Sequence, residues 1–228
     1  MKISVKNQQS DLDNEDIKWY LSEEKLWITK HNEYAEIENS IEKSVGSFNW
    51  LYEINDTILF SKKDKRFETA IIDLSGKIRV SDLESAFVTM KKQEKGELFF
   101  AEEGNCDFQF SSEIIYIKDS DVLAAYSANP EEKMAFILLI ADDFGFVINN
   151  AQLEGWVLKN ASKHICISQP YRSMHEDGGD LLEKYLNALN LWEEDEENTT
   201  ELRNLLENIK TKSDLLSLAV KESIINIL

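Results

Sequence analysis

Apolar residues occur along this chain in short runs, and the longest stretch rich in them extends from Glu131 to Leu158. Inside that stretch, Met134 to Ala141 contains no polar residue. A fully apolar run of this length forms either a central strand or a buried helix, and periodicity does not distinguish the two. In both cases we expect the residues from Met134 to Ile140 to lie in the core.

The residues that precede this run favour a helix. Asn129 is a capping residue, Pro130 occupies the first helical position, and the acidic Glu132 follows three positions after the cap. After the run, Gly145 suits either the end of a helix or a hairpin turn. We therefore predict a helix over Met134 to Ala141, with a strand as the alternative.

Elsewhere, short runs rich in β-branched and aromatic residues are separated by turn residues, which predicts an antiparallel meander. The segment from Ile17 to Ile28 suits both a helix and a strand, so the pattern leaves it open. The other expected strands are Met1–Lys6, Trp50–Ile54, Thr57–Phe60, Thr69–Leu74, Lys77–Val80, Leu98–Ala101, Cys106–Phe110, Ile114–Ile117, Gly155–Leu158 and His164–Ser168.

Apolar positions spaced three or four residues apart predict the helices. One helix is expected from Tyr34 to Val45, ending near Gly46, another after the capping box that begins at Ser81, and a short one over Asp121 to Ser127. A loop from Gln169 to Asp180 then precedes three helices, which are expected at Leu181–Trp192, Leu202–Ile209 and Leu215–Leu228.

Together these elements predict an α+β fold, with an antiparallel sheet, interspersed helices and a C-terminal helical layer. The best boundary separates a sheet domain, residues 1–179, from a helical layer packed on it, residues 180–228, and the two together can also form a single domain. No internal repeat is evident in the sequence. A chain of 228 residues that is 43% hydrophobic is long enough to bury a large core.

The charge balance excludes some classes of partner. The chain has 43 acidic and 25 basic residues, a formal net charge of −18, which repels nucleic acid and anionic membranes. No basic start is followed by a long apolar run, so a soluble, cytoplasmic protein is expected. We expect Cys106 and Cys166 to be buried thiols in a reducing compartment, and no motif calls for a cofactor.

Two acidic segments are the candidates for binding. Five adjacent carboxylates repel one another, so a run of this kind is tolerated where water screens it or is used where a basic partner meets it. Trp192 before the run is a candidate aromatic anchor. A second pair of acids directly follows the longest apolar run. The candidate partner-binding residues are therefore Trp192, Glu193, Glu194, Asp195, Glu196, Glu197, Asp142 and Asp143.

Strong negative charge without a catalytic motif favours a protein-binding function. We expect an immunity protein or similar inhibitor that neutralises a basic toxin or nuclease, because an acidic inhibitor associates rapidly with a basic enzyme. One alternative is an enzyme in which Asp142, Asp143 and Glu154 hold a divalent metal. Another is an assembly subunit that uses residues 180–228 as its interface. The pair His164 and Cys166 lacks the further ligands that zinc requires, which favours a structural role.

Overall fold

The computed structural model describes residues 1–8, 10–48, 56–76, 78–81, 92–110, 113–126, 135–167, 179–195 and 199–228. It contains two large sheets and several helices, so the predicted α+β class is confirmed. The predicted strand Trp50–Ile54, the helix after Ser81 and the cap at Asn129 lie outside the described residues. Within the described part of the chain, no helix is long and apolar enough to cross a membrane.

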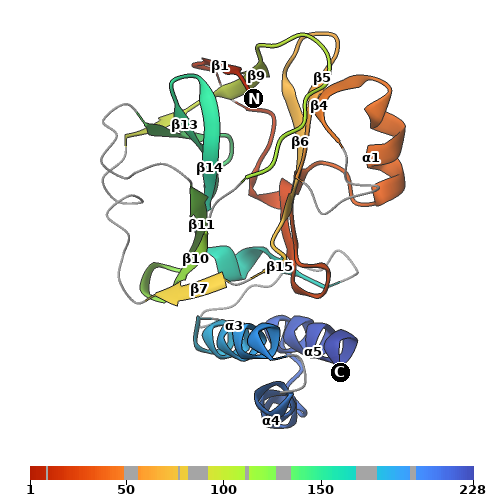
Figure 1. Ribbon diagram of the computed structural model, residues 1–228, viewed down its shortest axis with the longest axis vertical. Helices are drawn as coiled ribbons and strands as arrows, with labels where there is room; N and C mark the ends of the chain where they lie inside the picture. Colours follow the sequence, from red (N-terminus) through yellow and green to blue (C-terminus); the bar gives the residue numbers. More distant parts are fainter. Residues whose placement is uncertain are drawn as a thin grey trace.

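The first sheet has six strands in the order β15-β2-β3-β6-β5-β4. Neighbouring strands are antiparallel except β15 and β2, which are parallel. Helix α1 (Tyr34–Ile41) lies on the outer face of this sheet (Figure 1), where its buried Ile37 packs with Trp27 and Leu59. The strands are β2 (Ile17–Tyr20), β3 (Lys25–Thr29), β4 (Ser44–Ser47), β5 (Thr57–Ser61), β6 (Phe67–Asp73) and β15 (Ile165–Cys166).

The second sheet has seven strands in the order β7-β10-β11-β14-β13-β12-β8. A separate pair, β1 (Ile3–Lys6) and β9 (Glu97–Phe100), is antiparallel. The strands of the second sheet are β7 (Ile78–Ser81), β8 (Gln93–Lys95), β10 (Ile114–Ile117), β11 (Val122–Tyr126), β12 (Phe136–Leu139), β13 (Phe144–Asn149) and β14 (Gln152–Leu158).

The two sheets repeat one arrangement of strands. In the first half of the chain, residues 14–81, β2 and β3 form a hairpin, β4 follows, β5 and β6 form a second hairpin, and β7 crosses to the second sheet. The second half, residues 113–166, has the same order. Here β10 and β11 form a hairpin, β12 follows, β13 and β14 form a second hairpin, and β15 crosses to the first sheet. Each half therefore supplies the edge strand that lies parallel to the first strand of the other half.

The hairpins of the two halves also agree in the register of their strand pairing. A 3-10 turn joins the strands of both first hairpins, η2 (Leu21–Glu23) and η4 (Lys118–Ser120), and each turn ends on a residue with positive φ, Glu24 or Asp121. Both second hairpins carry a register shift at the same place, between Leu59 and Phe60 in β5 and between Val147 and Ile148 in β13. The structure thus contains an internal repeat that the sequence does not reveal.

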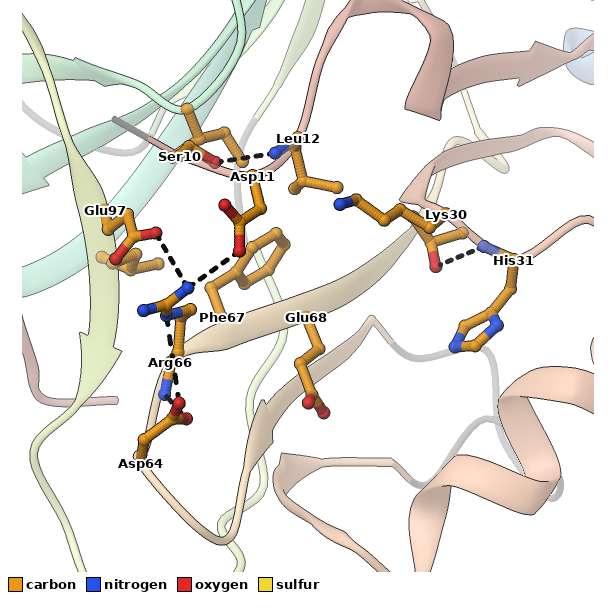
Figure 2. A pocket seen from close by; sticks show the side chains of 13 residues that line it. Ser10, Asp11, Leu12, Lys30, His31, Asp64, Arg66, Phe67, Glu68 and Glu97 are labelled. Carbon is orange, nitrogen blue, oxygen red and sulfur yellow. Dashed lines mark hydrogen bonds and ion pairs between the residues drawn. The ribbon is translucent and has the colours of Figure 1, made fainter. Parts of the chain in front are cut away.

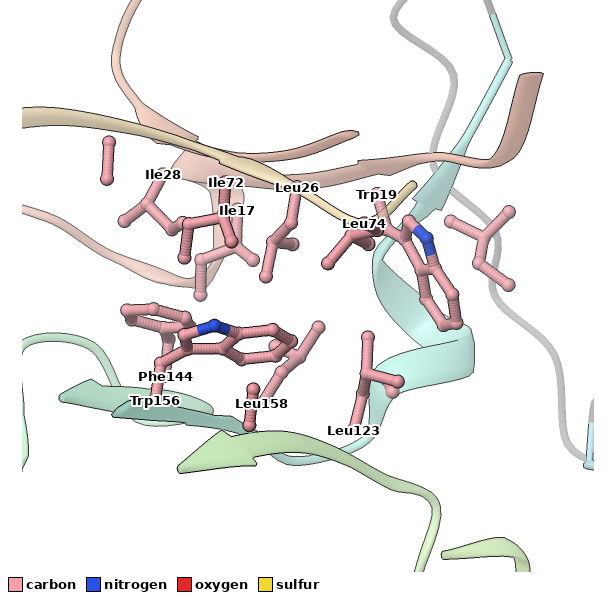
Figure 3. Close-up of a cluster of buried hydrophobic side chains, with 14 of the residues drawn as sticks. Ile17, Trp19, Leu26, Ile28, Ile72, Leu74, Leu123, Phe144, Trp156 and Leu158 are labelled. Carbon is pink, nitrogen blue, oxygen red and sulfur yellow. The ribbon is translucent and has the colours of Figure 1, made fainter. Parts of the chain in front are cut away.

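The main core lies between the two sheets. Figure 3 shows Ile17, Leu26 and Ile72 of the first sheet facing Trp156 and Leu158 of the second. All are almost completely buried, and burying a large apolar side chain contributes roughly 1.5–3 kcal/mol. This shared interior explains why the chain alternates in short runs, because each strand needs apolar residues on the face that meets the other sheet.

Three C-terminal helices form a layer across one end of the sheets (Figure 1): α3 (Gly179–Glu194), α4 (Thr200–Ile209) and α5 (Leu215–Ile227). The apolar faces of these helices belong to the same core cluster as the sheets. Tyr185 of α3 and Ser223 of α5 are joined by a hydrogen bond of 2.7 Å between their hydroxyl groups, and Asn190 donates one of 2.8 Å to the carbonyl of Ile78 in β7. The helical layer therefore covers the end where the exchanged strand β7 lies.

The predicted helix at Met134 to Ala141 is wrong for the described residues, because Phe136–Leu139 form strand β12. This strand lies between β13 and β8, and strands with neighbours on both sides and covered faces have continuous apolar sequences. The short helix predicted at Asp121 to Ser127 is also wrong, since Val122–Tyr126 form β11 between β10 and β14. In both segments tertiary pairing prevails over local helix signals.

Three smaller predictions need correction. Helix α1 ends at Ile41 rather than near Gly46, which lies in β4 at φ 133° where a side chain would collide with the backbone of Ile58. The segment Cys106 to Phe110 forms no strand, although it lies beside β4: the backbone N–H of Cys106 donates to the carbonyl of Gly46 at 3.0 Å, and that of Phe108 donates to the hydroxyl of Ser47. His164 ends a 3-10 turn, η5 (Ala161–His164), so only Ile165 and Cys166 are in the strand.

Candidate functional site

The acidic run predicted to bind a partner begins at the C-terminal end of α3. Leu191 is 45% exposed there, Trp192 is half-buried against the core, Glu193 is half-buried and Asp195 is exposed. The side chain of Glu194 and residues 196–198, including the predicted Glu196 and Glu197, lie outside the described residues. Carboxylates at a helix C-terminus face the negative end of the helix dipole, and the last turn of α3 has no basic residue. Folding alone does not favour acids at this place.

Asp142 and Asp143 lie in a different element, the turn between β12 and β13, and they differ from each other. Asp142 is exposed and forms an ion pair of 2.6 Å with Lys95. Asp143 points inward, where its carboxylate lies 3.1 Å from Nε2 of His164 and accepts a hydrogen bond of 2.9 Å from the side chain of Asn160. Asp143 is thus partly buried and held in the turn by its hydrogen bonds, whereas Asp142 is exposed.

The electrostatics of Asp143 reflect these contacts. Partial burial acts to raise the pKa of its carboxyl group, but the hydrogen bonds from His164 and Asn160 and the nearby charges outweigh burial and lower the pKa below its ordinary value. Glu154, the third acid of the metal hypothesis, accepts a hydrogen bond of 3.1 Å from Asn149. Among the residues that the structure describes, no group of three histidine, cysteine or acidic side chains is arranged to hold a metal ion.

A cavity of about 350 Å³ lies between the end of β3, the start of β6 and the N-terminal segment Ser10 to Leu12 (Figure 2). Arg66 lies on one wall, where its guanidinium group is 2.8 Å from Asp11 and 3.5 Å from the buried Glu97. Lys30 lies on another wall. The residues of this cavity come from five separate segments that only the fold brings together, so local sequence patterns do not predict it.

A buried lysine fixes the wall that carries Lys30. Lys18, which is only 7% exposed, donates hydrogen bonds from Nζ to the carbonyls of Thr29 at 3.1 Å and His31 at 2.8 Å. The hydroxyl of Thr29 bonds to that of Thr69 at 3.0 Å and accepts a bond from the backbone N–H of His31 at 3.2 Å. The backbone on both sides of Lys30 is thus held by a polar platform, which we define as Lys18, Thr29 and Thr69.

The described residues of the second half form no such platform, although its strands have the same pairing. Lys18 is paired with Trp27 in the first hairpin, and the equivalent Ile115 is paired with Ala124. The pair Thr29 and Thr69 between β3 and β6 corresponds to Tyr126 and Gly155 between β11 and β14. Because Ile115 occupies the equivalent position of the second half, the strand arrangement itself forms there without a buried ammonium group. One sequence signal was present: Lys18 is a lone charge inside the strand sequence IKWY.

Comparing equivalent positions in the two halves therefore helps to distinguish residues that serve folding from residues that have a further role. The cavity beside Lys30 and the acidic end of α3 are two places where the described residues depart from what folding alone favours. No protein-family model, no curated protein and no solved structure matches this chain. The functions proposed below are therefore based on the geometry and the charge of these two places.

Proposed function

We propose that this chain binds a basic protein partner, as an immunity protein or inhibitor that neutralises a basic toxin or nuclease. The observation that carries the proposal is the end of α3, where the exposed Leu191 and half-buried Trp192 are followed by Glu193 and Asp195. An exposed large apolar side chain that is followed in the sequence by an aromatic residue and by acids has the composition of an interface that receives a basic surface.

The net charge of −18 supports the same proposal through kinetics. Opposite charges on two proteins steer their encounter and raise the association rate, whereas the contacts at the centre of the interface set the dissociation rate. The carboxylates at the end of α3 then occupy the place on the partner where substrate phosphates bind. The free thiols Cys106 and Cys166 suit a reducing compartment, so we place this function in the cytoplasm.

The test uses the purified chain and the product of its neighbouring gene, with association measured by surface plasmon resonance at two salt concentrations. Changing Glu193 and Asp195 together to Lys is expected to slow association by about tenfold at low salt. The matched control changes Glu33 and Glu38 to Lys, at exposed positions at or beside the distant helix α1 that give the same change in net charge. Equal slowing by both variants contradicts the α3 site, and absence of any basic partner contradicts the function.

A second candidate function is assembly through the helical layer. The observation in its favour is on α5, where Leu218, Ile225 and the following Leu228 are exposed, Ile225 by 63%. Exposed large apolar side chains on one helix are typical of a surface that is covered by a partner. Light scattering separates the two candidates: a dimer that Ile225→Asp converts to a monomer favours assembly, and a monomeric wild-type chain excludes it.

A further inference from the structure

We propose that the cavity beside Lys30 binds a small zwitterion of amino-acid size, with the anionic group of the ligand at Lys30 and its cationic group at the carboxylates around Arg66. The cavity volume of about 350 Å³ lies at the lower end of the range for small-molecule pockets, roughly 300–1,000 Å³. This inference is independent of the protein-binding function, because it concerns a different surface.

The cationic wall of the cavity is Lys30. Figure 2 shows the side chain of Lys30 extending into the cavity toward Leu12. Lys30 makes no ion pair with any residue in the described ranges, so its ammonium group has no carboxylate partner there. The platform of Lys18, Thr29 and Thr69 fixes the backbone that carries it. The Lys30 side chain is exposed, so the anionic group of a ligand can reach its ammonium group and form a charge-assisted hydrogen bond with it.

The opposite wall is anionic in spite of Arg66. Three carboxylates surround its guanidinium group: Asp11 at 2.8 Å, Glu97 at 3.5 Å and Asp64 at 4.0 Å. A backbone hydrogen bond from Arg66 lowers the pKa of Asp64, which keeps this carboxyl ionised. One guanidinium group compensates one of the three negative charges, so the wall attracts a ligand amine.

Apolar side chains lie between the two charged walls. Leu12, Phe67, Leu98 and Ile140 line the cavity together with the charged residues. Phe67 and Leu98 are buried, which gives the cavity a fixed apolar surface. A ligand with an amine, a carboxylate and an aliphatic side chain satisfies all three kinds of surface, and leucine is the simplest probe of this kind.

The probe experiment compares leucine with two analogues that each lack one charged group, 3-methylbutylamine and 4-methylpentanoate. Calorimetry on the full-length protein is expected to show that leucine binds at least about tenfold more tightly than either analogue, since each analogue loses one charge-assisted contact. A panel of the common amino acids covers the case in which another side chain fits better. If no amino acid gives heat at millimolar concentration, or if the amine alone binds equally well, the proposal is wrong.

Two variants locate the binding. Lys30→Met keeps most of the side chain but removes its charge, and it is expected to weaken zwitterion binding at least about tenfold without changing binding of the amine. Lys63→Met is the matched control, because Lys63 is exposed in the nearby turn between β5 and β6 and does not line the cavity. Equal affinity of both variants for the zwitterion contradicts the assignment of Lys30.

Discussion

Asp143 and Asn14 exchange two hydrogen bonds of 2.9 Å, one from the Asn14 side chain to the Asp143 carboxylate and one from the Asp143 backbone to the Asn14 side chain. These bonds join the start of the first half of the chain to the second. Asp56 makes the comparable link from the first half, since it accepts a hydrogen bond of 2.5 Å from the backbone of Phe110, just before the second half. In each half, one aspartate therefore forms a hydrogen bond with the segment at the start of the other half.

The ionised carboxylate of Asp143 contributes to the stability of the folded protein. Its pKa is lowered in the folded protein, so its contribution is present above the unfolded-state pKa of about 4 and is lost as the pH falls through the lower folded-state pKa. Asp143→Asn is expected to reduce the free energy of unfolding by about 2 kcal/mol at pH 7. Urea unfolding from pH 3 to pH 7 checks this, and a difference that does not shrink at low pH contradicts it.

The aspartate Asp56 is expected to show the opposite pH dependence. Burial is the largest influence on Asp56 and raises its pKa to about 6, so its contribution to stability is complete below the unfolded-state pKa and is lost as the pH rises through 6. Between pH 4 and pH 7 the stability of wild type relative to Asp56→Asn should fall by about 2 kcal/mol. A pH-independent difference between the two proteins rules out this account of Asp56.

Exchange of strands between the halves predicts that a cut chain stays together. Cleavage at a specific protease site inserted between the exposed Glu103 and Gly104 places β7 and its neighbour β10 on different fragments. The same cut places β15 and its neighbour β2 on different fragments. After cleavage the two fragments should co-elute as one particle in size-exclusion chromatography and separate only in denaturant. Uncut protein carrying the same site is the control, and separate elution without denaturant is the contrary result.

Local sequence patterns predicted the fold class, the C-terminal helices and several strands, because these depend on spacing within a few residues. Confirmed positions include Thr57–Phe60, Ile114–Ile117 and Gly155–Leu158. The run at Met134 to Ala141 was assigned wrongly, since β12 is apolar because of its neighbours β13 and β8. The pairing of β12 with these strands cannot be predicted from the sequence immediately around β12.

The repeat and the cavity escaped sequence reasoning for a related reason. Equivalent positions in the two halves seldom have the same residue: Trp19 and Tyr116, for example, are both fully buried but differ in identity. The repeat is therefore visible in the strand order and register rather than in the sequence. The cavity joins Ser10 to Leu12 with Lys30, Arg66 and Glu97, which are far apart in the sequence. By contrast, the acidic run after Trp192 was found directly, because its residues are adjacent.

Lys18 fixes the backbone beside Lys30 in the wall of the cavity, and we predict that the fold itself does not need it. The most direct measurement is the free energy of unfolding of two reciprocal variants, Lys18→Ile and Ile115→Lys, which exchange the residues at equivalent positions. Lys18→Ile should change it by no more than about 1 kcal/mol, because an apolar residue replaces a buried ion. Ile115→Lys should lower it by at least about 3 kcal/mol, because it buries an unpaired charge. Similar large losses in both variants would contradict the claim and show that Lys18 is needed for folding.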